Sequence, residues 1–331
     1  EADLFYGAIQ GLVAGLDDPY STYFPPIEAR EFAKDLAGEF EGIGAEIGVR
    51  NEQLIIVAPL PGSPAEAAGI QAGDKIFAIN EKDTFSMTLE EAVMNIRGEK
   101  GTTVLLTITH NGFDTIEDVS VERDTITIPT VIWEMKEDSI AYMRLSYFNE
   151  STWADFDRSV QEILLANAKG IVLDMRMNPG GFLQTSVDVA SEWIEQGVVV
   201  SERFADGREN THRSRGKHRF ASMPTIVLVD EGTASGSEIV AGAIQDHEAG
   251  TVIGAQTYGK GSVQDFEILP DGSALKLTIA KWFTPDDRAI DGEGIVPDII
   301  VEEMFFVPEE GSEQTEIQDM GLEKAFELLK K

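Results

Sequence analysis

Residues 225–240 read TIVLVDEGTASGSEIV, an apolar run followed by a turn of small residues and the start of a second apolar run. An unbroken run of Val, Ile and Leu predicts a strand buried on both faces, as in the parallel sheets of α/β proteins. The run GIVLD at 170–174 has the same character, and helices are predicted to begin near Leu183 and Ser237. Alternating buried strands and helices therefore predict an α/β core.

The turn between this strand and its helix places a candidate nucleophile, Ser235, at a corner. A serine in such a corner can face a cleft, and the helix N-terminus offers N–H groups and partial positive charge to an oxyanion. The G-x-S-x-G spacing of the nucleophile elbow is absent, because Ala234 and Ser237 break it. In the alternative interpretation, which this segment taken alone favours, Ser235 or Ser237 caps the helix.

A serine nucleophile needs a general base, and a lysine is a better candidate here than a histidine. The chain has four histidines: His110, His212, His218 and His247. None falls at the end of a core strand, although His247 follows Asp246 and leaves a Ser-His-Asp triad open. Lys260 lies in GAQTYGKGSVQ (254–264), where flanking glycines let the backbone approach another segment closely. Burial would lower the pKa of its amine from the usual ~10.4 and leave it neutral, whereas a lysine in a surface loop stays protonated.

The same stretch is also close to a phosphate-binding loop. Gly254 to Lys260 fits the start of G-x-x-x-x-G-K-[ST], but Gly261 stands where a hydroxyl residue would hold magnesium. The net charge of −33, from 59 acidic and 26 basic residues, repels phosphate backbones and anionic lipids. The chain has no cysteine, which excludes disulfides and cysteine-based metal sites. We therefore predict that no nucleic acid, nucleotide, metal or other cofactor is bound.

Changes in composition along the chain predict four segments. They are an N-terminal helical segment at 1–37, a β-rich domain at 38–124, an α/β core at 125–302, and an acidic linker with a C-terminal helix at 303–331. Short alternating strands between Gly/Pro turns mark the second segment. The polar stretch Arg203–Phe220 predicts a long surface loop in the third. The first residue is Glu, so we expect a targeting segment to be missing from this chain.

Motifs in a fixed order resemble the carboxyl-terminal processing peptidases, or tail-specific proteases, a family of Ser-Lys enzymes that carry a PDZ domain. The resemblance runs from about Ala8 to Glu302. The motifs are LDDPYSTY (16–23), FEGIGA (40–45), PGSPA (61–65), GIQAGD (69–74), IRG (96–98), DMRMNPGG (174–181), GTAS (232–235), GKGSVQ (259–264) and DGEGIVPD (291–298). It implies that 38–124 is a PDZ domain inserted into an α/β core of the crotonase and Clp-protease type, after a helical N-terminal leader.

The resemblance also assigns chemical roles by position. It implies a nucleophile at Ser235, a general base at Lys260, a residue orienting that lysine at Gln264, and oxyanion donors at Gly236 and in the Gly180-Gly181 turn. Gln264 would act from the face of a helix or from the edge of a sheet. Gly236 departs from the alanine that the family usually has after the nucleophile. Asp174 is predicted to order the glycine turn, and Glu238 to be an ordinary acid in the first turn of a helix.

The glycine-rich loop at 42–45 is the predicted site for a peptide carboxyl end. A PDZ groove adds a peptide as an extra strand and caps its carboxylate with backbone N–H groups. The predicted peptide-binding residues are Gly42, Ile43, Gly44, Ala45, Val93 and Ile96. A glycine hairpin in an ordinary β domain is the alternative. Arg97 is the candidate for coupling peptide binding to assembly of the active site, since the family's PDZ domain can gate activity; otherwise it is a solvated cation at a helix end.

These assignments predict a serine endopeptidase that binds protein or peptide substrates with free apolar C-termini and cleaves near the C-terminus. The alternatives are a catalytically silent PDZ scaffold that binds C-terminal peptides, and a nucleotide enzyme. The resemblance implies an extracytoplasmic location, in the periplasm or cell envelope, with any membrane anchor in a segment absent from this chain. The sequence leaves the oligomeric state open, a homo-oligomer included.

Overall fold

The computed structural model describes residues 2–37, 39–50, 53–60, 62–85, 87–110, 116–127, 129–302, 304–306 and 318–330. The chain divides into two compact units, which are Glu1–Ala37 with Pro129–Lys331, and Gly38–Ile128. The second unit ends later than the predicted boundary at 124, because strand β9 (Asp124–Thr127) pairs with β2 (Glu39–Gly42). Most of the predicted acidic linker, including Pro308, lies outside the described residues.

A six-stranded sheet forms the centre of the first unit. Its strands, in spatial order, are β10 (Val131–Met135), β11 (Ile140–Leu145), β12 (Gly170–Asp174), β15 (Thr225–Val229), β16 (Thr251–Gly254) and β19 (Ile299–Ile300). Strand β10 is antiparallel to β11, which follows the 3-10 turn Glu137–Ser139, and the remaining pairs are parallel. Every residue of β12 and β15 is buried, as their apolar runs predict.

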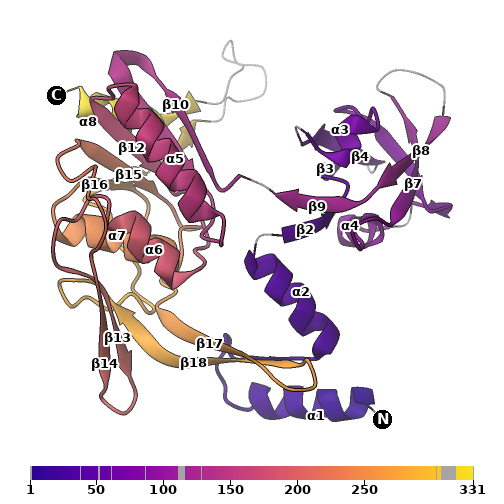
Figure 1. Ribbon diagram of the computed structural model, residues 1–331, viewed down its shortest axis with the longest axis horizontal. Helices are drawn as coiled ribbons and strands as arrows, with labels where there is room; N and C mark the ends of the chain where they lie inside the picture. Colours follow the sequence, from indigo (N-terminus) through magenta and orange to yellow (C-terminus); the bar gives the residue numbers. More distant parts are fainter. Residues whose placement is uncertain are drawn as a thin grey trace. The chain divides into compact units, whose positions relative to one another are not determined.

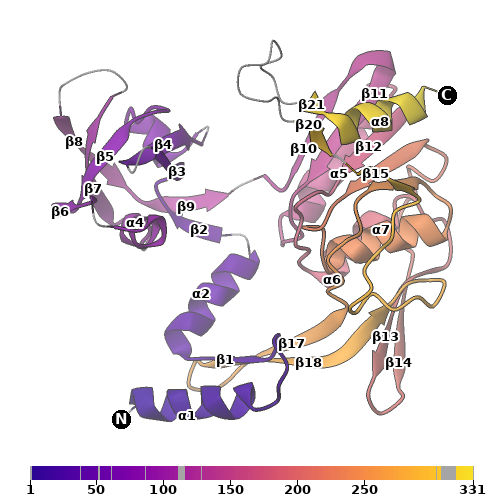
Figure 2. The ribbon, with the colours of Figure 1, turned by 180° about the vertical axis from the view of Figure 1, so that it is seen from behind.

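Helices cover both faces of this sheet (Figures 1 and 2). They are α5 (Thr152–Leu165), α6 (Leu183–Ala190), α7 (Gly236–Asp246) and α8 (Met320–Leu329). Alternate residues of a strand point to opposite faces. Ile171 and Leu173 accordingly join the apolar cluster of α5, α6 and α7, whereas Val172 joins the cluster of α8. No helix among the residues described here has the length and apolar character needed to cross a bilayer.

A second sheet of this unit joins the N-terminal segment to the core. Its order is β1 (Thr22–Phe24), β18 (Ala274–Phe283), β13 (Val198–Phe204) and β14 (Glu209–Arg213), with β17 (Ser262–Ile268) paired to β18. Helices α1 (Ala2–Ala14) and α2 (Pro26–Ala37) flank β1, which pairs with β18 across Thr22–Lys276. The predicted loop at 203–220 is wrong in part, because β13 and β14 form a hairpin. Strand β14 is polar and largely exposed, so no apolar alternation marked it in the sequence.

The second unit is a small β domain with its own apolar core. Its main sheet has the order β3 (Ala45–Arg50), β4 (Gln53–Pro59), β5 (Lys75–Ile79), β7 (Thr103–Thr109) and β8 (Ile116–Glu122), with β6 (Lys82–Asp83) paired to β5. Two helices complete it, α3 (Pro64–Ala67) and α4 (Leu89–Ile96). Helix α4 begins at a capping box, in which Thr88 and Glu91 satisfy each other's backbone N–H groups. Short strands β20 (Phe305–Phe306) and β21 (Gln318–Asp319) belong to the first unit.

Candidate active site

Ser235 lies at the corner between β15 and α7 in a strained backbone conformation, with φ 53° and ψ −114°. Few non-glycine residues adopt positive φ, and those that do are concentrated at functional sites. The corner packs on the glycine turn that follows β12. A Cβ placed on Gly180 would lie 2.8 Å from Ser235 Cβ and 2.6 Å from Gly236 N. The structure thus brings the predicted nucleophile and the predicted oxyanion residues together.

Two backbone N–H groups lie close to each other beside Ser235. Among the described residues, neither Gly181 N nor Gly236 N has a hydrogen-bond acceptor. A Cβ on Gly236 would lie 3.4 Å from Gly181 N, so the two donors are neighbours. Gly180 N instead donates to Asn178 Oδ1 at 2.9 Å. Of the glycine pair predicted from the sequence, Gly181 is therefore the one whose donor is available to an oxyanion.

Buried polar contacts hold this turn to the nucleophile corner. The Asn178 carbonyl accepts from Ala234 N at 2.9 Å and from the Ser237 hydroxyl at 3.0 Å. Ser237 is therefore used in tying the two segments together and does not cap the helix. The Phe148 backbone pairs with the glycine turn, and its carbonyl occupies the space that a side chain on Gly181 would need.

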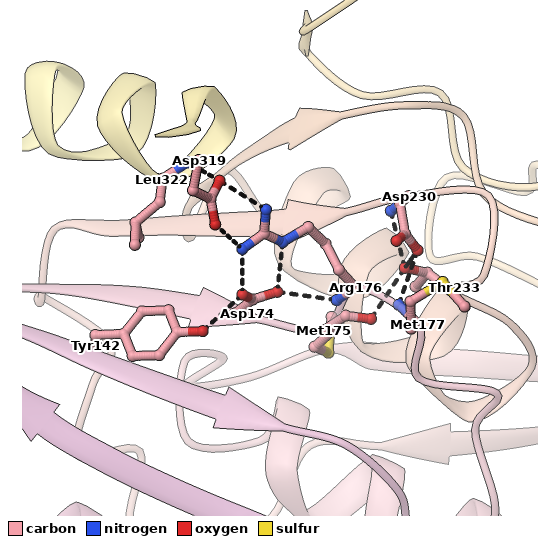
Figure 3. A network of polar contacts seen from close by, with 9 residues as sticks. All are labelled: Tyr142, Asp174, Met175, Arg176, Met177, Asp230, Thr233, Asp319 and Leu322. Carbon is pink, nitrogen blue, oxygen red and sulfur yellow. Dashed lines mark hydrogen bonds and ion pairs between the residues drawn. The ribbon is translucent and has the colours of Figure 1, made fainter. Parts of the chain in front are cut away.

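An ionic network fixes the start of the same loop (Figure 3). Asp174, at the end of β12, accepts from the backbone and the guanidinium of Arg176 at 3.0 and 2.9 Å, as expected for a residue that orders the turn. Arg176 also donates to both oxygens of Asp319, the N-cap of α8, at 2.8 and 2.7 Å. Tyr142 donates to Asp174 at 2.8 Å, and burial together with this carboxylate raises the pKa of Tyr142.

Lys260 lies two residues before β17, in a loop that contacts the backbone of residues 290–294. A Cβ on Gly259 would lie 3.1 Å from the carbonyl carbon of Gly292, and one on Gly261 would overlap the Asp291 backbone. The flanking glycines therefore permit the close approach that the sequence predicts. Lys260 itself is half-buried.

A single buried carboxylate, that of Glu238, joins the segments of both candidate catalytic residues. Its Oε2 accepts from Ser235 N at 2.7 Å and from Lys260 N at 2.9 Å. Its Oε1 accepts from Gly259 N at 2.6 Å and from the Thr257 hydroxyl at 2.5 Å. Burial raises the pKa of Glu238, and these four donors oppose the shift. The sequence prediction treated Glu238 as an ordinary helix-end acid and missed this bridge.

The side-chain amine of Lys260 lies over the ring of Tyr20, with Nζ 5.5 Å from the ring centroid. Gln264 Nε2 donates to the Tyr20 carbonyl at 3.3 Å. Gln264 belongs to strand β17, which pairs only with β18 among the described strands, so its position is at a sheet edge and not on a helix. No hydrogen bond between the described atoms joins Lys260 Nζ to the Ser235 hydroxyl.

The structure argues against the two alternatives from the sequence, a histidine base and a phosphate-binding loop. His247 Nε2 bonds to the Val198 carbonyl at 2.7 Å, so this ring supports β13 and is not placed beside Ser235 as a triad would require. The segment after Lys260 forms strand β17, whereas a phosphate-binding loop is followed by a helix. The match of Gly254–Lys260 to a phosphate-binding pattern is therefore not accompanied by the required structure.

The second unit contains a pocket of about 210 Å³ at the predicted peptide site. Its lining includes Gly42, Ile43, Gly44, Ala45, Val93, Ile96 and Arg97. Strand β3 is an edge of its sheet, and an edge strand can accept an added strand. The N–H groups of Ile43 and Gly44 have no acceptor in the part of the chain that the structure describes. The pocket thus combines an open strand edge, apolar walls and two available backbone donors.

Arg123 fixes one wall of this pocket and was not found from the sequence. It is largely buried, and its guanidinium donates to the carbonyls of Ile96 at 2.7 Å and Asn95 at 3.1 Å, at the C-terminal end of α4. Burial lowers the pKa of Arg123. A basic residue satisfying the last carbonyls of a helix is a common cap, but here it comes from a distant strand end, and no local pattern indicates it.

Two protein-family models match separate parts of the chain. Residues 139–301 match the model of peptidase family S41, and residues 33–109 match the PDZ domain model. Carboxy-terminal processing protease CtpA of Bacillus subtilis (strain 168) is 39% identical over 297 residues, which are 89% of this chain and 63% of that protein. The carboxyl-terminal-processing protease of Picosynechococcus sp. (strain PCC 7002) is 39% identical over 304 residues, or 90% of this chain and 73% of that protein.

A solved structure titled photosystem II D1 C-terminal processing protease has a similar fold. It aligns with a TM-score of 0.58 and 29% identity, covering 91% of this chain and 82% of that one. The chain described here spans less than two thirds of the Bacillus protein and about three quarters of the Picosynechococcus protein.

Proposed function

Because the chain belongs to the S41 family of carboxyl-terminal processing proteases and carries a PDZ domain, we propose that Ser235 and Lys260 form a dyad that cleaves proteins near their carboxyl ends. The observation that carries this assignment is the Glu238 bridge. One buried carboxylate accepts from the backbone N–H of both residues, so the two lie on segments fixed to a common point. Burying a carboxylate costs free energy unless its oxygens accept hydrogen bonds, so a buried acid of this kind indicates a structural purpose.

In the proposed reaction, the Ser235 hydroxyl attacks the carbonyl carbon of the scissile bond while neutral Lys260 accepts its proton. The N–H groups of Gly236 and Gly181 stabilise the oxyanion of the tetrahedral intermediate. Lys260 then returns the proton to the leaving amine, and the tail fragment departs from the acyl-enzyme. Lys260 then takes a proton from a water molecule that attacks the ester, and it returns this proton to the Ser235 oxygen as the acyl group leaves, which restores both residues. Gln264 orients the lysine from the sheet edge.

The PDZ pocket would select the substrate before cleavage. A carboxylate accepted by the N–H groups of Ile43 and Gly44 would place the tail along β3, and Val93 and Ile96 would contact an apolar terminal side chain. Holding the tail raises the local concentration of the cleavable segment, which favours chain ends over internal loops. Arg97 lines the same pocket and is the proposed residue through which a bound tail promotes assembly of the active site.

The proposal extends to the fold class and the cellular location. The layered arrangement of parallel strands with α6 and α7 on one face supports a core of the crotonase and Clp-protease type, preceded by a helical leader. The family resemblance supports an extracytoplasmic protein, in the periplasm or cell envelope. Fractionation of cells that express the full-length protein tests this location.

Cleavage of an unstructured protein with an apolar tail tests the dyad. Ser235→Ala and Lys260→Ala should each abolish cleavage while tail binding, followed by fluorescence anisotropy, is retained. Lys217→Ala, which removes an exposed lysine, is the matched control and should cut normally. If both dyad variants still cleave, the assignment is wrong. Tail binding without any cleavage by the wild type would instead support the alternative of a PDZ scaffold.

A further inference from the structure

The turn before β1 is built into the sheet that carries the candidate base. Ser21 is buried, and its hydroxyl donates to Asp18 and accepts from Thr278 N, on β18, at 3.2 Å. Asp18 Oδ1 also accepts from Tyr20 N at 3.3 Å. Residues Thr22–Phe24 then pair with β18. Tyr20 is therefore held on both sides, by the aspartate turn before it and by the strand after it.

Tyr20 contacts both the candidate base Lys260 and its neighbour Gln264. Its ring lies under Lys260 Nζ at 5.5 Å, within the distance at which an ammonium is attracted to an aromatic face. Its carbonyl accepts from Gln264 Nε2 at 3.3 Å. In a side-chain contact of this kind the ring binds the cation and not the neutral amine, so the contact depends on the protonation state of the lysine.

We propose that Tyr20 is a positioning residue for the general base, which makes the N-terminal turn part of the active site. The ring holds the Lys260 ammonium in place between reaction cycles, and the carbonyl fixes the Gln264 amide at the sheet edge. This inference rests on the proposed function, because it concerns the lysine of the dyad. The ring stabilises the charged lysine, so its removal makes Lys260 lose its proton at lower pH.

Other titratable groups face the same space and set the background for a pH measurement. Lys276, on β18, is close enough to be affected by Lys260; burial, followed by the Lys260 charge, lowers the pKa of Lys276. Tyr258, Asp291 and Asp18 act on Tyr20 itself, and burial followed by the Tyr258 hydroxyl raises the pKa of Tyr20. A variant that changes only the ring at position 20 leaves all of these groups in place.

The first test is the pH dependence of kcat/KM on an unstructured substrate. Tyr20→Leu keeps bulk but removes the aromatic face, and the acidic limb should move to lower pH by about 0.5 to 1 unit. The maximum rate should fall as well, because the amine is less restricted. Tyr20→Phe keeps the face and should keep the wild-type limb. Tyr20→Trp offers a stronger cation-binding face and should move the limb to higher pH.

The second test does not depend on activity. In the Ser235→Ala background, an NMR titration of lysines labelled at ¹³Cε follows Lys260 directly, with its signal assigned by loss in Lys260→Met. The pH of the titration midpoint should follow the same order among the variants at position 20. It should be at or above the wild-type value in Tyr20→Trp, close to it in Tyr20→Phe, and lowest in Tyr20→Leu. Equal midpoints in folded variants overturn the inference even if Lys260→Ala abolishes cleavage. If Lys260→Ala leaves cleavage intact, the dyad fails, and the titration still decides whether Tyr20 holds the ammonium.

Discussion

At the scale of single residues, the glycine after the candidate nucleophile has a local structural reason. The resemblance in the sequence predicts alanine at this position, whereas this chain has Gly236. A Cβ on Gly236 would overlap the Ser186 hydroxyl on α6, which is fully buried and donates to the Phe182 carbonyl at 3.1 Å. Gly236 and Ser186 therefore form a matched pair, in which the hydroxyl fills the place of the missing methyl group.

This pair gives the first prediction. Gly236→Ala should displace the first turn of α7 and with it an oxyanion donor, lowering kcat about tenfold or more, with an overpacking cost of about 1–3 kcal/mol in the free energy of unfolding. Removing the hydroxyl in Gly236→Ala/Ser186→Ala should recover most of both losses, since a Cβ on Gly236 lies 3.5 Å from Ser186 Cβ. Kinetics and urea unfolding of the two variants decide it. A double variant as impaired as the single one contradicts this explanation.

The Glu238 bridge gives the second prediction. Glu238→Gln replaces one acceptor oxygen by an amide that donates, so that two buried N–H or O–H donors lose their acceptor. Each such loss costs about 1–3 kcal/mol, and kcat should fall because the segments of Ser235 and Lys260 separate. Glu323→Gln is the control, since Glu323 is an exposed acid in the first turn of α8. Equal unfolding curves for the two variants would contradict the structural role of the Glu238 bridge.

Only the part of the candidate site that lies within sequence motifs was predictable. The motif order located Ser235, Lys260 and Gln264, and the structure brings Gly181 and Gly236 beside the serine. Glu238 and Tyr20 were missed because each acts through contacts distant in sequence. The sequence contained one indication for Glu238. An acid at the third position of a helix, directly before an apolar run, lies next to the buried face and needs hydrogen-bond donors there.

At the scale of elements, the sequence predicts buried strands well and exposed ones poorly. Strands β12 and β15 are unbroken apolar runs because both of their faces are covered by helices. Among the described strands, β14 pairs only with β13, and it has polar residues on both sides, so its composition is that of a loop. Similarly, β9 extends the small unit past the predicted boundary, because its partner β2 lies at the other end of that unit's sequence.

The third prediction concerns helix α4, the apolar wall of the peptide pocket. Arg123→Met removes the donors that hold the Ile96 and Asn95 carbonyls, so the end of α4 should loosen. Affinity for an apolar tail peptide should fall by about five- to tenfold, which corresponds to about 1–1.5 kcal/mol of binding free energy. Fluorescence anisotropy in the Ser235→Ala background measures it. Lys100→Met, which breaks an exposed ion pair with Asp124, is the control and should bind normally.

At the scale of the whole molecule, charge is the dominant feature. The net charge of −33 makes like charges repel one another across the surface. We predict that the melting temperature rises as NaCl increases from about 10 mM to about 500 mM, because the Debye length falls from about 30 Å to a few ångströms. Calorimetry measures the shift, and KCl should reproduce it. A melting temperature independent of salt would show that the repulsion is already compensated.

The shared carboxylate of Glu238 has a consequence for the timing of catalysis. With the main chain of Ser235 and Lys260 anchored to one buried group, the lysine amine can change partners only by torsion about its own aliphatic bonds. Torsions of exposed side chains take picoseconds to nanoseconds, whereas loop rearrangements take microseconds or longer. In the proposed dyad, movement of the Lys260 amine toward the Ser235 hydroxyl therefore needs torsion of the lysine side chain but no rearrangement of the backbone that Glu238 anchors.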